Sequence, residues 1–269
     1  MYELELDALE YIKNCPENTV PREIALVERA AGLRIFDAPI FAYSAADDPS
    51  FASFREAGVV GPHHMTPGDW LRGAKTVISV FLPFSEEVRV ANRPNDGLPA
   101  PEWLHARIQG QELLSSLIVY LCGRMRAKGH KCMVPSEDAR FTTSPHDAEE
   151  DSFTSNWSER HVAYASGHGT FGLSAGLITK SGMAGRFGSL VTDLYIEPTV
   201  KTYSDHLAYC MRCGACAERC PVGAISLESG KNHALCSDFI DSTRTPPVYY
   251  GCGKCQVGVP CEARPPLNV

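Results

Sequence analysis

The C-terminal part of this 269-residue chain is crowded with cysteine, and this crowding constrains the structure more than any other feature. Eight of the eleven cysteines fall between Cys210 and Cys261, whereas the first 209 residues contain only Cys15, Cys122 and Cys132. Disulfides in a secreted chain are normally spread through the fold. The acidic N-terminus has no export signal, so we expect a reducing, cytoplasmic setting. Eight sulfurs gathered in one segment favour metal ligation.

The first half of this segment has the cysteine spacing of bacterial ferredoxins. Cys210, Cys213, Cys216 and Cys220 are separated by two, two and three residues, and Pro221 follows. In such a run three sulfurs bind one iron–sulfur cluster and the fourth binds another. A zinc site needs only two separated pairs, which leaves the middle Cys216 unexplained. The motif therefore predicts [4Fe–4S] clusters in preference to zinc or disulfides.

The second half supplies four more sulfurs, which completes the ligands of two clusters. Five residues separate Cys255 from Cys261, where a plain ferredoxin has three, so the partition between clusters is an inference from the crosswise rule. That rule gives Cys210, Cys213, Cys216 and Cys261 to cluster 1, and Cys220, Cys236, Cys252 and Cys255 to cluster 2. Such a pair conducts single electrons.

Strands and helices alternate before the cysteines, which predicts an α/β or α+β domain over residues 1–198, with the ferredoxin-like domain over 199–269. Thr76–Pro83 is β-branched and apolar, as in a strand buried on both faces. Apolar residues at helical spacing predict a long helix over Pro101–Gly129. Phe171–Lys180 and Phe187–Ile196 have the character of two further strands.

Charge and hydropathy exclude some classes of function. The net charge is −7 and Lys and Arg form no run, which argues against a nucleic-acid partner. No apolar window reaches the length of a membrane helix, so we expect a soluble protein without a membrane partner.

Three small motifs before the cysteines do not by themselves identify a function. Gly167, Gly169 and Gly172 match a dinucleotide fingerprint formally, but they follow an expected helix and enter a strand. We interpret Gly167, His168 and Gly169 as a close backbone approach, either to a flat cofactor such as a corrin or to the rest of the protein. His63-His64 is interpreted as an exposed loop, and Arg186 as a solvated residue that is also able to meet an anion.

The order of these motifs resembles the epoxyqueuosine reductase family and, more distantly, the reductive dehalogenases. The matching residues run from Leu71 to Glu262. They are Leu71–Phe84, Lys128–His130, Glu159-Arg160, Gly167–Gly172, Gly188–Leu194, Cys236–Phe239 and Tyr250–Gln256.

The resemblance implies a nitroreductase-like, cobalamin-binding type of domain ahead of the ferredoxin domain. It also implies cobalamin as a further cofactor, an electron donor such as ferredoxin or flavodoxin, and a small-molecule acceptor that the sequence does not identify. The sequence ends at Val269 without a match to the helical-repeat extension of the queuosine enzymes, and the net charge is negative, so we do not expect a tRNA partner.

One departure from the family concerns the catalytic acid. Thr142 stands where the family has an Asp general acid, and a threonine does not deliver a proton as a carboxylic acid does. Asp147, Glu149, Glu150 and Asp151 follow, either as a substitute or as a solvated loop. The catalytic residues are therefore not assigned. The sequence favours an iron–sulfur reductase, and the alternatives are an electron carrier without a catalytic site and a protein with structural clusters.

The ligand count gives a direct prediction. Protein purified anaerobically should contain about eight iron atoms per chain, because two clusters have four each. Iron and sulfide analysis measures this, and a content of about four iron atoms, or zinc in place of iron, contradicts the ligand assignment.

Overall fold

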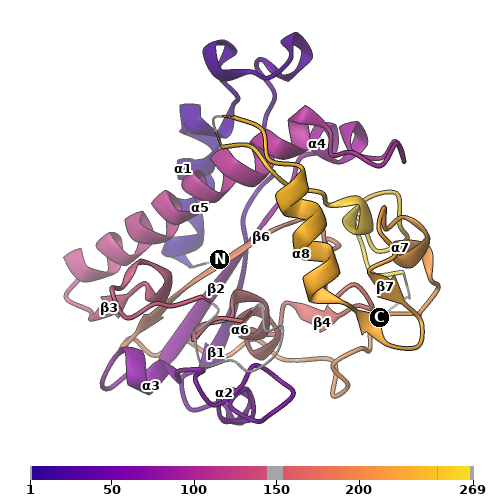
Figure 1. The fold of residues 1–269 in the computed structure, drawn as a ribbon. Coiled ribbons are helices and arrows are strands. Elements are labelled where there is room, and N and C mark those ends of the chain that lie inside the picture. Colours follow the sequence, from indigo (N-terminus) through magenta and orange to yellow (C-terminus); the bar gives the residue numbers. More distant parts are fainter. Residues whose placement is uncertain (1, 144–153, 247, 267–269) are drawn as a thin grey trace.

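A four-stranded antiparallel sheet forms the centre of the N-terminal part, in the order β1-β2-β6-β3. The computed structural model describes residues 2–143, 154–246 and 248–266 (Figure 1). The strands are β1 (Ile40–Ala45), β2 (Thr76–Pro83), β6 (Gly185–Thr192) and β3 (Cys132–Met133). Antiparallel pairing makes the domain α+β, which confirms the second of the two fold classes that the sequence allowed.

Helices cover both faces of this sheet. On one face lie α5 (Pro101–Ala127) and α1 (Glu3–Asn14), and on the other lies α6 (Glu159–Ser166). Alternate residues of β2 enter the two cores: Ile78 and Val80 belong to the same core as Leu117 of α5, whereas Val77 belongs to the core of Trp157. The predicted strand buried on both faces and the predicted long helix are both confirmed.

One predicted strand was wrong. The run from Phe171 to Lys180 forms the hairpin of β4 (Gly169–Phe171) and β5 (Leu177–Thr179), because the chain reverses between them. The Gly172 amide donates to the carbonyl of Gly176 at 2.8 Å, and Ala175 in this turn has a φ of 57°.

The remaining helices of the N-terminal part are α2 (Pro49–Ser53), α3 (Pro67–Trp70) and α4 (Glu86–Ala91).

The cysteine-rich part folds beside the sheet and contains few regular elements. They are α7 (Ala215–Glu218), β7 (Ile225–Ser226), β8 (Gly230–Lys231) and α8 (His233–Ser242). In Figure 1 this part, in orange and yellow, lies to the right of the sheet and next to α4 and the start of α5. None of the helices in the described residues has the length and apolar character needed to cross a membrane.

Glu262 anchors the end of the cysteine-rich part to α4. Its buried carboxylate accepts a hydrogen bond from Arg93 Nη2 at 2.8 Å and one from Arg89 Nη1 at 3.3 Å. The amide of Gly258 donates to the same carboxylate at 2.6 Å. Burial raises the pKa of Glu262, but the hydrogen bond from Arg93 and the other contacts outweigh this, so the pKa is lowered and the side chain is charged.

Lys254 makes a second anchor beside the cysteines. It is 1% exposed, and its Nζ donates to the carbonyl of Pro94 at 2.7 Å and to Asp96 Oδ1 at 3.1 Å. The adjacent Gly253 has a φ of +70°, and a Cβ there would lie 2.0 Å from the ring of Trp103 in α5. Only glycine therefore allows this close approach, and it holds the cysteine loop directly on α5.

Replacing the first anchor should loosen the attachment. Glu262→Gln should destabilise the protein by about 1–3 kcal/mol, because it removes the charge from hydrogen bonds that are charge-assisted. The loss should vanish at acidic pH, since the contribution of a lowered pKa is complete above the pKa of the unfolded state and disappears as the pH falls through the lower pKa of the folded state. Urea unfolding followed by circular dichroism measures this.

Glu10→Gln is the matched control, because Glu10 is exposed. An equal effect of the two substitutions at neutral pH would show that Glu262 is not an anchor.

Candidate functional site

The eight cysteines of the C-terminal part gather into two groups in space. Cys210, Cys213, Cys216 and Cys261 line a small cavity beside Met183. Cys220, Cys236, Cys252 and Cys255 line a larger cavity of about 660 Å³. These are the two sets that the crosswise rule gives, and all eleven cysteines are free of disulfides. Among the described residues, no three His, Cys, Asp or Glu side chains converge closely enough to hold a single metal ion.

The pKa of Cys252 and the pKa of Cys261 are raised by burial and by the neighbouring sulfur atoms of the same group. Burial, and then the neighbouring sulfurs of the first set, raise the pKa of Cys261 to about 12. Burial also raises the pKa of Cys252 to about 11, and Cys255, Cys236 and Cys220 act in the same direction. Without a cation these thiols are neutral at pH 7. Bound metal deprotonates a thiol outright, so each group is a place where cationic iron is favoured.

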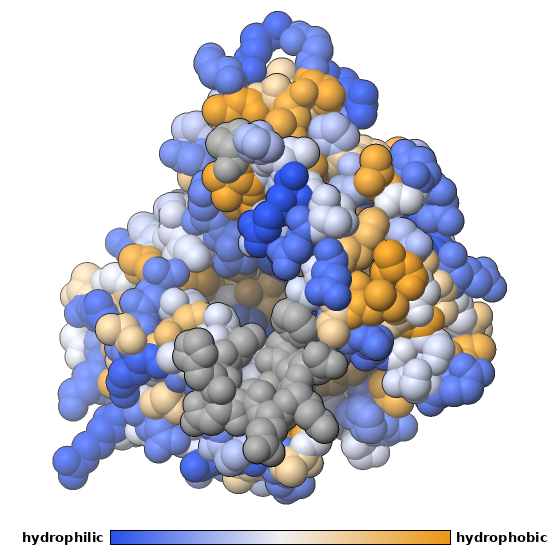
Figure 2. All heavy atoms as spheres, viewed as in Figure 1, coloured by the Kyte–Doolittle hydropathy of each residue, from blue (hydrophilic) through white to orange (hydrophobic). Residues whose placement is uncertain are grey.

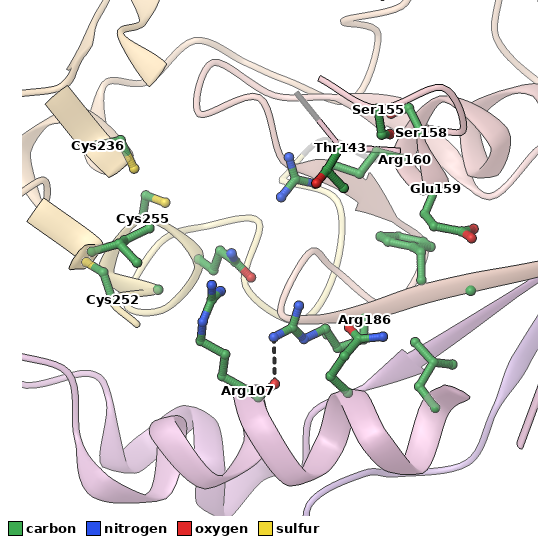
Figure 3. A pocket seen from close by; sticks show the side chains of 18 of the residues that line it. Arg107, Thr143, Ser155, Ser158, Glu159, Arg160, Arg186, Cys236, Cys252 and Cys255 are labelled. Carbon is green, nitrogen blue, oxygen red and sulfur yellow. Dashed lines mark hydrogen bonds between the residues drawn. The ribbon is translucent and has the colours of Figure 1, made fainter. Parts of the chain in front are cut away.

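The larger cavity lies between the cysteine-rich part and the sheet domain. Figure 3 shows Cys236, Cys252 and Cys255 on one side of it, and side chains of α5, α6 and β6 on the other. On the face drawn in Figure 1, a recess is visible between the helices on the left and the cysteine-rich part on the right (Figure 2). An acceptor in this cavity would therefore lie next to the second set of cysteines.

Three arginines from three different elements enter this cavity. Arg107 comes from α5, Arg160 from α6 and Arg186 from β6 (Figure 3). Burial, together with the like charges of Arg107 and Arg160, lowers the pKa of Arg186 to about 9, which leaves the side chain charged at neutral pH. Arg160 is exposed at the edge of the cavity, where Cys255 and Cys236 lie close enough for their charges to act on it. The cavity is thus strongly cationic.

Glu159 is the carboxylic acid of the cavity wall formed by α6. Its two carboxyl oxygens are buried and have no hydrogen-bond partner among the described residues. Burial raises the pKa of Glu159 to about 8, although Ser189 and Trp157 nearby act in the opposite direction. At neutral pH the side chain is therefore mainly protonated, which is the state of a proton donor.

A second cavity adjoins the first. Its volume is about 1180 Å³, and it extends along α6 past His161 and Tyr164 as far as Cys210 of the first cysteine set. The two cavities share the lining residues Thr143, Ser155, Ser158, Arg160 and Lys231. Together they connect the two cysteine groups on one side of the molecule.

The residues Gly167, His168 and Gly169 pack inside the sheet domain and line none of these cavities. His168 Nε2 lies 3.1 Å from the carbonyl oxygen of Ser79, and burial lowers the pKa of His168 to about 4. A Cβ on Gly169 would lie 1.9 Å from the carbonyl oxygen of Ile178, and one on Gly167 would lie 3.1 Å from Thr199. This packing favours the second interpretation of the motif, a close approach to the rest of the protein. A cofactor-binding role stays a prediction.

The interpretation of His63-His64 as an exposed loop was wrong for His64. That side chain is 1% exposed and stacks on Trp157, and burial lowers the pKa of His64 to about 4. Thr142 is exposed, and its amide donates to Asn156 Oδ1 at 3.0 Å, while the neighbouring Thr143 lines both cavities. The carboxylates at Asp147, Glu149, Glu150 and Asp151 lie outside the described residues.

Sequence reasoning missed most of this cavity. Arg107 lies in the long helix among apolar residues. A charged residue at such a position was the one sequence signal that could have indicated a functional side chain. Arg186 was interpreted as a solvated residue that is also able to meet an anion. Glu159 was singled out only as part of the family resemblance. The three arginines are far apart in the sequence, so their convergence depends on the fold.

Comparison with known proteins identifies the iron–sulfur part and the fold. The family model of the 4Fe-4S binding domain matches residues 206–226, so this segment is a [4Fe–4S] binding domain. No curated protein matches the chain.

Several solved structures are similar. An epoxyqueuosine reductase in complex with a tRNA-Tyr epoxyqueuosine-modified stem loop is 18% identical, with a TM-score of 0.54 over 97% of this chain and 66% of that one. The epoxyqueuosine reductase of Bacillus subtilis has the same identity and coverage, with a TM-score of 0.53. The catabolic reductive dehalogenase NpRdhA, bound to 3-bromo-4-hydroxybenzoic acid, is 14% identical, with a TM-score of 0.52 over 84% of this chain and 30% of that one.

At these identities the likeness concerns the fold. The chain spans about two thirds of the length of the epoxyqueuosine reductases and under a third of the dehalogenase. The protein therefore has an α+β domain of the epoxyqueuosine reductase and reductive dehalogenase fold, joined to a [4Fe–4S] binding domain.

Proposed function

We propose that this protein is an iron–sulfur reductase, in which two [4Fe–4S] clusters pass single electrons to an acceptor bound between the two domains. The supporting observation is the cavity of about 660 Å³, which has four cysteines on one side and Glu159 and the arginines on the other. The domain boundary near residue 198 belongs to this proposal.

Electrons enter at the first cysteine set and leave at the second. Cys213 of the first set is exposed, so a donor such as ferredoxin or flavodoxin reaches this cluster at the surface. Cys220 belongs to the second set, and only three residues separate it from Cys216 of the first set. This short connection between a ligand of one cluster and a ligand of the other holds the two clusters close together. The second cluster then faces the acceptor.

The residues present fit a corrinoid only if it extends through both cavities. Their shared wall contains Thr143, Ser155 and Ser158, whose hydroxyl groups suit the amide side chains of a corrin. These residues would hold it, and the chemistry that a corrinoid supplies when bound is one-electron chemistry at cobalt. Reduction also needs a proton. Glu159 holds one at neutral pH, in the wall of the cavity, where Thr142 supplies none.

Electron delivery is tested with the reconstituted, reduced protein and hydroxocobalamin, mixed anaerobically in a stopped-flow instrument. Cys236→Ser should lower the iron content toward about four per chain and slow reoxidation at least about tenfold, because the cluster facing the cavity is lost. Cys15→Ser, at a half-buried thiol outside both sets, should change neither value.

Cobalt that remains with the protein after gel filtration would make the corrinoid a cofactor. Rapid reoxidation without retained cobalt would instead indicate a carrier or a direct reductase. An unchanged rate in Cys236→Ser would contradict a path through the second set.

The protonated Glu159 predicts a dependence of stability on pH. Its pKa is raised from 4.5 to about 8, so the folded state keeps a proton that the unfolded state releases. Stability should therefore fall as the pH rises through this window. Glu159→Gln should remove this loss and be more stable than the wild type by on the order of 3 kcal/mol at pH 8.

Urea unfolding at several pH values measures the effect, and Glu112→Gln, at an exposed position of α5, is the control. Parallel pH profiles of the wild type and Glu159→Gln would show that Glu159 is ionised like an ordinary surface residue and is not a proton donor.

A further inference from the structure

In the part of the chain that the structure describes, the arginines of the cavity of about 660 Å³ have no carboxylate partners. Elsewhere in the protein, an arginine that approaches the interior pairs with an acid, as Arg89 does with Glu262 at 3.3 Å. Among the described residues, no ion pair joins Arg107, Arg160 or Arg186 to any acid, although the chain carries a net charge of −7. Three guanidinium groups in one cavity repel one another, and a negative ligand would relieve this repulsion.

Two of these side chains are held in place by contacts that leave most of their donors free. Arg107 stacks on the ring of Tyr250, with 4.4 Å between the guanidinium carbon and the ring centre, and its buried Nε has no hydrogen-bond partner. Arg186 Nη2 donates to the carbonyl oxygen of Arg107 at 2.8 Å, which is the dashed line in Figure 3. A guanidinium has five N–H donors, so both side chains remain able to bind an oxyanion.

The negative charge of the iron–sulfur cluster explains only part of this arrangement. Arg160 is close enough to Cys255 and Cys236 for their charges to act on it. Arg186 instead has Arg107, Arg160 and Tyr250 as its charged or ionisable neighbours. Figure 3 shows Arg107 on the side of the cavity nearer the cysteines and Arg186 beyond it. Arg107 also packs against Gly251, next to Cys252. Arg107 and Arg186 therefore form a cationic pair that extends away from the cluster, and the cluster does not account for Arg186.

We propose that Arg107 and Arg186 bind the oxyanion group of the substrate, a carboxylate or a phosphate. This inference rests on the proposed function, because it takes the cavity as the site of the electron acceptor. A guanidinium pair matches either group through parallel hydrogen bonds. The substrate is then a small anionic molecule that suits a cavity of about 660 Å³, with its reducible part toward Arg160 and the second cysteine set.

Isothermal titration calorimetry of the anaerobic holoprotein tests this with two probes, inorganic phosphate and benzoate, at constant ionic strength. We expect one of them to bind saturably at about one molecule per chain. Tighter binding of phosphate would indicate a phosphorylated substrate, and tighter binding of benzoate a carboxylic acid. Arg186→Gln should weaken this binding at least about tenfold, because it removes a charged bidentate donor.

Arg22→Gln is the matched control. It changes the charge equally at an exposed ion pair with Glu28, and it should leave binding unchanged. Arg107→Gln tests the same pair from another element and replaces Arg186→Gln if that variant does not fold.

The proposal would be overturned if the wild type bound neither probe saturably. It would also be overturned if both arginine variants bound the probe as tightly as the wild type does. Iron analysis of the same samples distinguishes a failure of the oxyanion site from a failure of the proposed reductase function. A full iron content without anion binding contradicts only the oxyanion site, whereas a protein that takes up no iron contradicts the proposed reductase.

Discussion

The constraint on which this structure depends is the need to hold eight sulfur atoms in two compact groups. Buried thiols that crowd one another resist ionisation, as the raised pKa of Cys252 and Cys261 shows. Iron resolves this conflict, because it binds the thiolate form and supplies positive charge where the fold has gathered sulfur. Binding and folding of this part are therefore coupled, and its few regular elements suffice only because the cysteines tie the loops to a common centre.

The anchors of the cysteine-rich part determine where the second group faces. Glu262 and Lys254 hold the loops on α4 and on the segment that follows it, and Gly253 admits the ring of Trp103 from α5. The second group thus faces α5, α6 and β6. The cavity exists because these two parts of the chain meet there, and neither part contains it alone. The proposed electron path and the proposed proton donor are both properties of this junction.

The sequence was sufficient for features that depend on local spacing. Apolar spacing gave α5, the β-branched run gave β2, and the cysteine run identified the [4Fe–4S] domain. The sequence did not predict features that depend on contacts between distant segments. The turn at Gly172 splits a run that resembles one strand, and His64 is buried by the distant Trp157. The arginine pair was beyond sequence reasoning for the same reason, because its members lie on α5 and β6.

The measurement that tests the central claim most directly is an anomalous diffraction map at the iron absorption edge, from crystals of the anaerobic holoprotein. It should show two separate four-iron densities, one surrounded by Cys210, Cys213, Cys216 and Cys261, and one by Cys220, Cys236, Cys252 and Cys255 at the wall of the cavity. A single cluster, or a second cluster that does not face the cavity, would contradict delivery of electrons to an acceptor between the two domains.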